Sequence, residues 1–449
     1  MKKVTIVGAG LVGSLWAVFL SKAGYKVQIF ERRPDIRKAE IAAGKSINLA
    51  LSDRGWKALK LAGVDHLIRE IAIPMPGRMI HDLRGNLTFQ PYGRKGQAIY
   101  SVSRGGINAR MMDIAEQIGN ADIRYNAKCI GADLKNGVCY FKDTTNGEGF
   151  EVKSDLIFAC DGAFSAVRYH AMQKLDRFNY EQRYIQDGYR EILLPANADG
   201  SYKMEKNALH IWPRGRFMLI ALPNEDGSFT CTLFMPFEGE NSFEKLQTRD
   251  QVDSFFKTTF PDFYELMPNV GEAWEDHPLA SLAIIRCFPW HHGKAVLMGD
   301  AAHATVPFYG QGMNAGFEDC TVMNHLMQKH NHNWDKVFEE FSLTRKPDGD
   351  GLQELSLHNY YVMRDYVADP KFLLQKKIEA LFSEKHPDKW MPLYSMTTFS
   401  DIRYSEAWRE GQRQQRIMDE VMAMDNIENL WDQPQVEQKI LELLEAYKN

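Results

Sequence analysis

The chain has 449 residues, of which 44% are hydrophobic and 25% are charged. This is an ordinary globular composition with room for about two or three packed units. The formal net charge of −5, without a lysine- or arginine-rich tail, argues against a nucleic-acid partner. No apolar run reaches the roughly 18 residues of a membrane-spanning helix, and the chain starts in a strand pattern instead of a signal peptide. We therefore expect a cytoplasmic protein without a transmembrane anchor.

The cysteines and histidines do not suggest a metal site. The six cysteines are scattered and lack CxxC spacing, which favours reduced, structural thiols. The pair His291 and His292 lies at a turn, and His330 and His332 lie in a polar loop. Neither pair has the Cys, His or carboxylate neighbours that zinc requires, so we expect no metal.

The first chemical motif is a glycine-rich turn between a strand and a helix. The strand pattern Lys3–Val7 runs directly into Gly8, Gly10 and Gly13, and a helical pattern follows. Glu31 ends the next strand, 18 residues after Gly13, which is close to the interval of roughly 20 residues in dinucleotide-binding βαβ units. In such units the glycines let the backbone approach a pyrophosphate and the acid accepts ribose hydroxyls. The alternative is a turn that only permits tight packing.

A second motif lies between Gly299 and Cys320. The apolar run 295–298 reads as a buried strand, Asp300 follows at its carboxyl end, and a loop rich in proline and glycine leads into a helix that begins near Gly312. The free N–H groups of a helix start attract negative charge, such as that around N1 and the C2 carbonyl of a reduced flavin. Asp300 suits a ribityl hydroxyl. The alternative is a tight turn before an ordinary helix.

A third motif helps to decide which dinucleotide binds. The segment 154–168 reads as an apolar strand that ends in Asp161 and Gly162, followed by a polar turn and a helix; its alternative reading is a simple strand-to-helix corner. Glu31 alone does not separate NAD from FAD, because both carry an adenosine ribose. A nicotinamide dehydrogenase would not need the distant segment 299–320, whereas FAD needs one site for its adenosine and another for its flavin. The three motifs together favour FAD.

In this order, the three motifs resemble those of the single-component flavoprotein aromatic hydroxylases. Six further segments are similar to the kynurenine 3-monooxygenase family, and the similarity runs from Met1 to about Trp408. These segments are 46–52, 77–81, 91–93, 100–104, 359–364 and 392–394. The resemblance implies an FAD-dependent monooxygenase that uses NADPH and O₂ to hydroxylate L-kynurenine at ring position 3. The reaction would proceed through a flavin C4a-hydroperoxide and belong to tryptophan degradation by the kynurenine pathway.

The expected fold is α/β, with a Rossmann-like FAD-binding domain, an inserted antiparallel sheet as substrate domain, and a C-terminal helical cap. Because the three flavin motifs lie far apart yet must meet on one cofactor, we expect the FAD-binding domain to be discontinuous. Its expected pieces are 1–75, 100–180 and 285–330. The sheet-rich substrate domain is expected from 76–99 and 181–284.

Two details of this organisation follow from local pattern. Residues 209–235 read as three strands joined by short turns, which indicates an antiparallel meander. The region 331–449 reads as helical, and the amphipathic pattern at Val436–Leu444 should pack against the protein rather than insert into a membrane.

The resemblance also implies which residues contact the cofactor. They lie in the glycine turn, after the second strand, at the adenosine end, and around the helix start of the second motif. The expected cofactor contacts are Gly8, Gly10, Val12, Gly13, Phe30, Glu31, Arg32, Arg33, Ala50, Arg104, Asp161, Asp300, Gly312, Met313 and Asn314. No second dinucleotide fingerprint is present for NADPH, so the co-substrate is expected to dock transiently.

The substrate contacts are carried by the resemblance alone. Arg78 matches the arginine that binds the kynurenine carboxylate and Tyr92 its hydroxyl partner, and a guanidinium can grip a carboxylate through two hydrogen bonds. Asn359 and Tyr394 match two contacts from the helical cap. Taken without the resemblance, Arg78 reads equally well as a structural arginine, and the other three as core or turn residues.

Further residues near the flavin loop have expected roles. Pro307, Phe308 and Gln311 are expected to wall the pocket, and Tyr309 stands where relatives often have phenylalanine. His303 is expected to pack or hydrogen-bond rather than to shuttle protons. No side-chain general base is required, so no catalytic side chain is assigned.

Two other functions remain open from the sequence. One is an FAD hydroxylase of another aromatic acid, which would keep the three flavin motifs. The other is a dinucleotide-binding protein without catalysis. The oligomeric state does not follow from the sequence.

Overall fold

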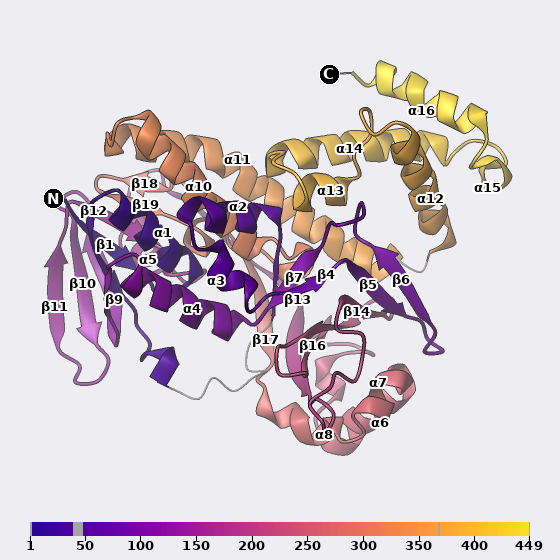
Figure 1. The fold of residues 1–449 in the computed structure, drawn as a ribbon, viewed down its shortest axis with the longest axis horizontal. Helices are drawn as coiled ribbons and strands as arrows, with labels where there is room; N and C mark the ends of the chain where they lie inside the picture. Colours follow the sequence, from indigo (N-terminus) through magenta and orange to yellow (C-terminus); the bar gives the residue numbers. More distant parts are fainter. Residues whose placement is uncertain (1, 39–47, 367–368, 449) are drawn as a thin grey trace.

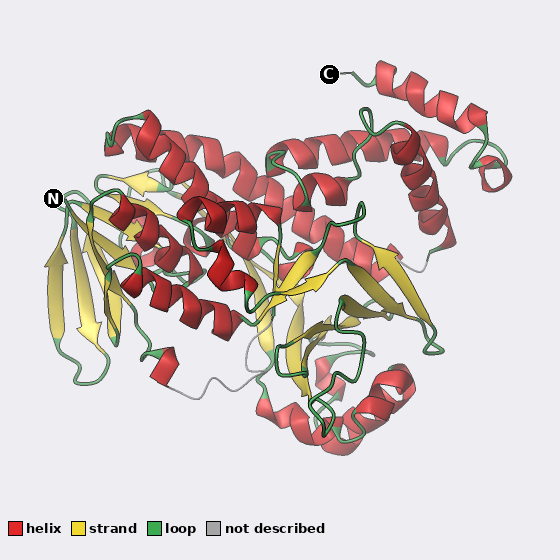
Figure 2. Cartoon of the chain, viewed as in Figure 1, coloured by secondary structure: helices red, strands yellow, loops and turns green. Residues whose placement is uncertain are grey.

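The structure is a computed structural model that describes residues 2–38, 48–366 and 369–448. Figure 1 shows a helix-flanked sheet at the N-terminal side, a second sheet next to it, and a group of helices formed by the C-terminal part of the chain. Figure 2 shows that strands are concentrated in the first two regions and that the C-terminal region is helical. The expected α/β class is therefore confirmed. Ser46 and Ile47 lie outside the described residues.

The first sheet is parallel and buried. Its strands are β1 (Lys3–Val7), β2 (Lys26–Phe30), β8 (Asp122–Arg124), β12 (Leu156–Ala159), β18 (His291–His292) and β19 (Ala295–Leu297). The order is β18-β19-β12-β1-β2-β8, and only the edge pair β18–β19 is antiparallel. Every residue of β12 and β19 is buried, as is typical of parallel strands with helices on both faces. The strand predicted before Asp300 is confirmed as β19, which lies between β18 and β12.

Helices cover this sheet. They are α1 (Leu11–Lys22), α2 (Asp53–Ala62), α3 (Asp65–Arg69), α4 (Arg104–Gln117), α5 (Ala166–His170), α9 (Asp300–His303), α10 (Gly312–Lys329) and α11 (Trp334–Tyr361). Helix α10 packs against both α1 and α2, and Phe158 of β12 contacts the rings of Trp334 and Phe338 at 5.5 and 5.6 Å. The helix predicted to begin near Gly312 is confirmed.

Two small antiparallel sheets complete the N-terminal region. One has the order β3-β7-β4 and the other β11-β10-β9. Their strands are β3 (Leu49–Leu51), β4 (Ile73–Met75), β7 (Ile99–Val102), β9 (Ala127–Asp133), β10 (Val138–Asp143) and β11 (Gly149–Lys153). In Figure 1 the sheet of β9, β10 and β11 lies at the far left edge, whereas β4 and β7 lie beside β5 of the next sheet. The β3-β7-β4 sheet therefore lies at the junction of the two larger sheets.

The second large sheet has the order β17-β13-β16-β15-β14-β5-β6. Its strands are β5 (Gly77–His81), β6 (Leu87–Pro91), β13 (Asn179–Leu194), β14 (Ala208–Pro213), β15 (Met218–Pro223), β16 (Phe229–Pro236) and β17 (Ala280–Phe288). The predicted meander is confirmed as β14-β15-β16. The sheet is not wholly antiparallel, because β5 joins β14 in parallel, with Arg78 opposite Leu209. Parallel neighbours need a long connection, and here the chain between them passes through the first sheet.

The two faces of the second sheet have different neighbours. Helices α6 (Arg249–Thr259), α7 (Pro261–Leu266) and α8 (Val270–Ala273) cover one face. On the other face, the Phe234 ring contacts the Phe308 ring at 4.9 Å. Phe308 belongs to the short 3-10 turn η5 (Pro307–Tyr309), which lies two residues before α10. The second sheet therefore faces the predicted flavin loop.

The C-terminal region consists of helices and packs around its own apolar core. Its elements are the π-helical turn η6 (Val362–Tyr366), α12 (Pro370–Lys385), α13 (Leu393–Thr398), α14 (Tyr404–Val421), α15 (Ile427–Leu430) and α16 (Pro434–Ala446). Helix α16 buries Val436, Ile440, Leu443 and Leu444 in this core. The prediction that the terminal amphipathic pattern packs is confirmed. Among the described residues, no helix combines the length and apolar character needed to cross a membrane.

Candidate active site

The glycine turn after β1 is shaped for close approach of a ligand. Gly8 has a φ of 100°, and a Cβ at Gly13 would lie 2.1 Å from the Gly8 carbonyl oxygen, so glycine is needed at both positions. A Cβ at Gly10 would instead meet no atom of the described residues within 4 Å. Helix α1 begins after Gly10 without a side-chain cap, and its first N–H groups lack intrahelical partners. This turn therefore offers donors to an anion.

Glu31 lies against this turn. It is buried, and its Oε2 accepts a hydrogen bond from the Ala9 backbone N–H at 3.0 Å, while Oε1 accepts from the backbone N–H and Nε of Arg33, both at 3.0 Å. The side chain of Phe30 stacks on Phe141 in the core at 4.3 Å, and its carbonyl oxygen accepts from Gly8 N–H at 2.8 Å. Phe30 thus supports the turn through its backbone.

Asp161 lies at the end of β12, beside the glycine turn. A Cβ at Gly8 would be 2.6 Å from the Cys160 carbonyl oxygen. Oδ2 of Asp161 accepts from Ala166 N–H at 2.6 Å and Val167 N–H at 3.3 Å, which caps α5. Its Oδ1 is buried without a hydrogen-bond partner among the described residues, and burial raises the pKa of the carboxyl group. This acceptor remains available to a ligand or water.

The corner after β19 is held by a buried carboxylate. Asp319 Oδ2 accepts from Gly299 N–H at 2.8 Å and pairs with His303 Nε2 at 2.6 Å, and Oδ1 accepts from Arg345 Nε at 2.9 Å. Burial alone would raise the pKa of Asp319, but His303 and Arg345 outweigh it and hold this pKa below its ordinary value. The hydrogen-bonding role expected for His303 is the one seen. Within the described residues, the half-buried carboxylate of Asp300 has no ion pair or side-chain hydrogen bond.

Asn314 organises the start of α10 with its side chain. It is fully buried; Oδ1 accepts from Ser52 N–H at 2.8 Å, and Nδ2 donates to the carbonyl oxygens of Ala50 and Gly310 at 2.8 and 2.9 Å. The side chain of Asn314 is therefore used by the protein. What α10 offers a ligand is its uncapped start, where Gln311 makes no side-chain cap and the first N–H groups are free of intrahelical bonds.

Val12 brings the two helix starts together. It follows Gly10 on α1, and a Cβ at Gly316 of α10 would lie 2.6 Å from Val12 Cγ2. A Cβ at Gly299 would lie 2.9 Å from the same atom. The close contact between α1 and α10 therefore depends on the glycines that face Val12. This contact places the glycine turn near the start of α10.

The substrate residues of the second sheet meet α13 of the helical region. The Arg78 guanidinium lies 5.2 Å from the Tyr92 ring centre and 5.6 Å from that of Tyr394, within cation–π range. The Tyr92 and Tyr394 rings stack at 5.1 Å, and the Tyr309 and Tyr394 rings stack at 5.5 Å. Among the described residues, half-buried Arg78 has no carboxylate partner.

The phenols of this stack stay protonated. Burial raises the pKa of Tyr394 to about 12, although Arg78 opposes the shift. Burial also raises the pKa of Tyr92 well above its ordinary value. The Tyr92 hydroxyl is buried, and its polar neighbours within the part of the chain described are the Tyr394 hydroxyl and the Arg78 guanidinium. A guanidinium without a carboxylate partner among the described residues, beside two phenol hydroxyls, suits an anionic ligand.

Asn359 reaches the same region from α11. Its Nδ2 donates to the Phe308 carbonyl oxygen at 2.7 Å, and Phe308 stacks on Tyr360 at 4.1 Å. The next residue is Tyr309, which stacks on Tyr394, and a Cβ at Gly310 would touch the Ala50 Cβ at 3.1 Å. The loop 307–311 therefore joins the predicted cofactor contacts to the predicted substrate contacts.

Other predicted contacts lie at the edge of the site. Arg32 and Arg33 are exposed beyond Glu31, and Arg104 is exposed at the first position of α4. Met313 is half-buried at the start of α10. The structure joins none of these four directly to the tyrosine stack.

Sequence reasoning missed Arg54, which is buried on α2 between the cofactor and substrate regions. It lies in the first turn of its helix, where a cation opposes the helix dipole. That local conflict was the signal in the sequence that could have drawn attention to it.

The residues present fit a dinucleotide with a second, charge-bearing end. The glycine turn, Gly10 with open space at its Cβ position, and Glu31 suit the adenosine and pyrophosphate. The uncapped start of α10 suits the negative charge of this second end, and the carboxylate of Asp300 suits hydroxyl groups beside it. The cation at Arg78 is linked to this second end through Tyr394 and Tyr309, which precedes α10.

Comparison with known proteins agrees with this geometry. Residues 1–332 match the family described as FAD binding domain. The kynurenine 3-monooxygenase of Flavobacterium johnsoniae is 53% identical over 444 residues, which cover 99% of each chain. The protein of the same name from Sus scrofa is 44% identical over 418 residues, which cover 92% of this chain and 88% of that one.

Solved structures share the fold. The tetrameric form of 2-methyl-3-hydroxypyridine-5-carboxylic acid oxygenase matches with a TM-score of 0.68 at 18% identity, covering 82% of this chain and 94% of that one. Tetracycline destructase Tet(51) matches with a TM-score of 0.58 at 16% identity, covering 81% and 91%. The matches to relatives over nearly the whole length show more than the fold: the chain belongs to the kynurenine 3-monooxygenase family of FAD-binding flavoprotein monooxygenases.

Proposed function

We propose that the protein hydroxylates L-kynurenine at ring position 3, with FAD as cofactor and NADPH and O₂ as co-substrates. The observation that carries this proposal is the half-buried guanidinium of Arg78 beside the stacked rings of Tyr92 and Tyr394. L-Kynurenine has one carboxylate, and a planar guanidinium binds such a group through two charge-assisted hydrogen bonds. A hydroxyl of the neighbouring Tyr92–Tyr394 pair would donate a further hydrogen bond to it.

The cofactor contacts are proposed to follow the three motifs. Gly8, Gly10, Val12, Gly13 and the backbone of Phe30 would hold the pyrophosphate and its turn. Glu31, with Arg32 and Arg33 beside it, would bind the adenosine. The remaining proposed contacts, near the ribityl chain and the flavin, are Ala50, Arg104, Asp161, Asp300, Gly312, Met313 and Asn314, of which Asn314 would contribute through its backbone because its side chain is occupied.

FAD would supply the redox chemistry and the activation of O₂. The protein would hold the aromatic ring of the substrate beside the flavin with its carboxylate on Arg78. Asn359 would orient the amino acid end or the ring amine through its Oδ1, since its Nδ2 already donates to Phe308. The free N–H groups at the start of α10 would stabilise negative charge on the reduced ring.

The tyrosine stack and Phe308 would also exclude water. Tyr92, Phe308 and Tyr309 are buried and Tyr394 is half-buried, and they connect Arg78 to the start of α10. A site with few competing water molecules favours transfer of oxygen to the ring over release of peroxide. No side chain is proposed as a general base.

Three further parts of the proposal concern the protein as a whole. NADPH is proposed to dock transiently on a surface shared with the flavin site. The pieces 1–75, 100–180 and 285–330 are proposed as the FAD-binding domain, with 76–99 and 181–284 as the substrate domain and 331–449 as the helical region. The cytoplasmic location remains a prediction.

A set of three ligands tests the substrate assignment. The FAD-loaded protein would be assayed for NADPH oxidation with L-kynurenine, with the amine that lacks only its carboxylate, and with 4-hydroxybenzoate. Strong stimulation by L-kynurenine alone is expected, because only it presents both the aniline ring and the carboxylate that Arg78 would bind. Equal stimulation of NADPH oxidation by the decarboxylated amine would contradict the proposal that Arg78 binds the substrate carboxylate. Stimulation by 4-hydroxybenzoate alone would favour a hydroxylase of phenolic acids.

A further inference from the structure

Arg54 is a buried cation that contacts both α10, on the proposed cofactor side, and α13, on the proposed substrate side. We propose that it is a positioning residue that sets the Tyr394 ring against the flavin-facing start of α10. Because Tyr394 is a substrate contact only under the proposed function, this role rests on that function.

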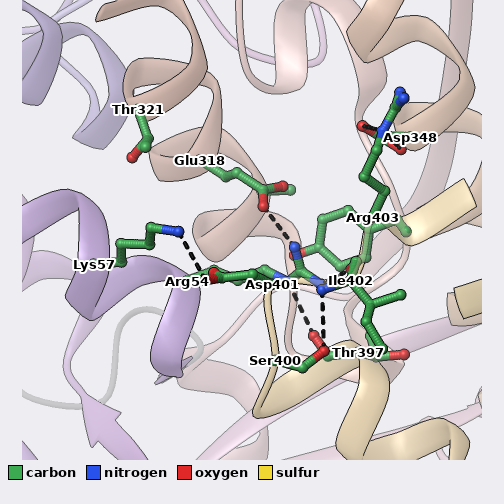
Figure 3. Close-up of polar contacts among 12 residues, drawn as sticks. Arg54, Lys57, Glu318, Thr321, Asp348, Thr397, Ser400, Asp401, Ile402 and Arg403 are labelled. Atoms are coloured by element: carbon green, nitrogen blue, oxygen red, sulfur yellow. Dashed lines mark hydrogen bonds and ion pairs between the residues drawn. The ribbon is translucent and has the colours of Figure 1, made fainter. Parts of the chain in front are cut away.

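The contacts of Arg54 join three parts of the chain. Its side chain, on α2, is 1% exposed. Nη1 pairs with Glu318 Oε1 of α10 at 2.5 Å, and Nε donates to the Thr397 carbonyl oxygen at 3.1 Å. Nη2 donates to the carbonyl oxygens of Met396, at 3.4 Å, and Ile402. Figure 3 shows the guanidinium between the helix that carries Glu318 and the segment 397–402.

On the substrate side, Arg54 binds the end of a very short helix. Met396 and Thr397 belong to the last turn of α13 (Leu393–Thr398), where carbonyl groups lack intrahelical partners and carry the negative end of the helix dipole. Tyr394 lies in the first turn of the same helix. A helix of this length moves as a unit, so the guanidinium that fixes its end also fixes the Tyr394 ring.

On the cofactor side, Arg54 acts through two neighbours. Glu318 lies on α10, whose first turn is the proposed flavin-facing helix start. The guanidinium also lies 4.2 Å from the centre of the Tyr404 ring, and the Tyr404 hydroxyl donates to Gln311 Oε1 at 3.0 Å. Gln311 directly precedes α10. One side chain therefore holds α13 in register with both the body and the start of α10.

An arginine can position α13 more precisely than apolar side chains at this place could. Replacing a buried ion pair by apolar side chains often leaves stability unchanged or improves it, so stability is a weak reason for a buried cation here. The planar guanidinium presents five donors in fixed directions. In this protein the guanidinium of Arg54 donates to one carboxylate and three carbonyl oxygens from separate segments. These bonds fix the orientation of α13 relative to α10.

Lys57 provides a matched control on the same helix. Its Nζ pairs with Asp401 Oδ2 at 2.9 Å, so it too joins α2 to the segment 399–403. The two side chains are 54% and 72% exposed, and solvated pairs of this kind contribute little. Lys57→Met removes a cation between the same elements without touching the end of α13.

The test compares FAD-loaded wild type, Arg54→Met, Arg54→Lys and Lys57→Met. Binding of L-kynurenine is measured by calorimetry, and peroxide released per NADPH consumed reports how well the ring is placed. Hydrogen exchange of the backbone amides of residues 393–399 reports how firmly α13 is held in place, and it needs no ligand. Arg54→Met is expected to bind L-kynurenine about 10-fold or more weakly, to release more peroxide, and to exchange the α13 amides faster.

The controls make the outcome decisive. Arg54→Lys keeps the charge but has fewer donors in fixed directions, so an intermediate loss is expected, and Lys57→Met should match wild type. Wild-type affinity, coupling and exchange in FAD-loaded Arg54→Met would overturn the positioning role. If Arg54→Met does not fold, the same result in Arg54→Lys would overturn it. If wild type itself binds no L-kynurenine, the proposed function fails, and hydrogen exchange still decides whether Arg54 locks α13.

Discussion

The rings of Tyr92 and Tyr394 lie almost parallel, with centres 5.1 Å apart and planes inclined by 11°. Tyr92 follows β6 of the second sheet, whereas Tyr394 belongs to α13 of the C-terminal region. Their contact brings together segments that are 302 positions apart, and Arg78 lies beside both rings. The proposed substrate site is therefore complete only when the C-terminal region is docked on the sheet.

Arg78→Ala is expected to weaken L-kynurenine binding by about 10- to 150-fold, because hydrogen bonds to a charged group contribute about 1.5–3 kcal/mol. Arg78→Lys should recover part of this, since it keeps the charge and loses the two-pronged geometry. Arg84→Ala, which removes an exposed arginine from the turn between β5 and β6, is the control. Unchanged affinity in Arg78→Ala would remove the main physical support for the substrate assignment.

The glycine turn allows cofactor binding to be separated from folding. Gly13→Ala should destabilise the protein without FAD by about 1–3 kcal/mol, because its Cβ would collide with the Gly8 carbonyl oxygen. Gly10→Ala should leave the stability of the FAD-free protein nearly unchanged, since its Cβ would meet no atom of the described residues within 4 Å, yet it should weaken FAD binding. Urea unfolding of the FAD-free proteins and FAD titration measure both effects. Normal FAD affinity in Gly10→Ala would contradict a pyrophosphate site at this turn.

Asn314 should tolerate neither of its two simplest replacements. Asn314→Ala loses three buried hydrogen bonds and should cost about 2–4 kcal/mol of unfolding free energy. Asn314→Asp keeps the size of the side chain and the bond from Ser52 N–H, but its second oxygen would face the carbonyl oxygens of Ala50 and Gly310. Thermal unfolding and FAD content should both fall in Asn314→Asp. A stable, FAD-loaded Asn314→Asp would show that the amide donor is not required.

The pair of His303 and Asp319 predicts a pH-dependent stability. Burial alone would lower the pKa of His303, but Asp319 outweighs it and raises this pKa above the ordinary value of 6.5. The stabilisation by protonated His303 is therefore complete below about pH 6.5 and is lost as the pH rises through the folded-state pKa. In that window the slope for this group is about −1.4 kcal/mol per pH unit.

Urea unfolding of wild type and His303→Gln across this range measures the effect. The difference in unfolding free energy should be largest below pH 6.5 and shrink toward alkaline pH. If the unfolding free energies of wild type and His303→Gln change with pH in parallel, His303 is not protonated in the folded protein.

Local sequence patterns predicted the parts of the fold that depend on neighbouring residues. The glycine turn, the helix start at Gly312 and the meander each have a spacing that short-range stereochemistry explains. The parallel pairing of β5 with β14 was not predicted, because it depends on where a distant segment docks.

In the site, too, local features were predicted from the sequence and long-range contacts were not. The turn and the end of β19 could be located from spacing, whereas the substrate residues came from resemblance to a family, because no spacing relates Arg78 to Tyr394. Neither the tyrosine stack, in which Tyr309 packs on Tyr394, nor the contacts of Arg54 with α13 have a local signature. Both depend on long-range packing of the C-terminal region.

The central claim is tested most directly by the fate of molecular oxygen. The FAD-loaded protein would be given L-kynurenine, NADPH and ¹⁸O₂, and the product would be analysed by mass spectrometry with fragmentation to locate the new oxygen. The account predicts that one labelled oxygen atom is added to the aromatic ring next to the amine-bearing carbon, with one NADPH consumed for each product. NADPH consumption that yields only labelled peroxide, with L-kynurenine unchanged, would contradict it.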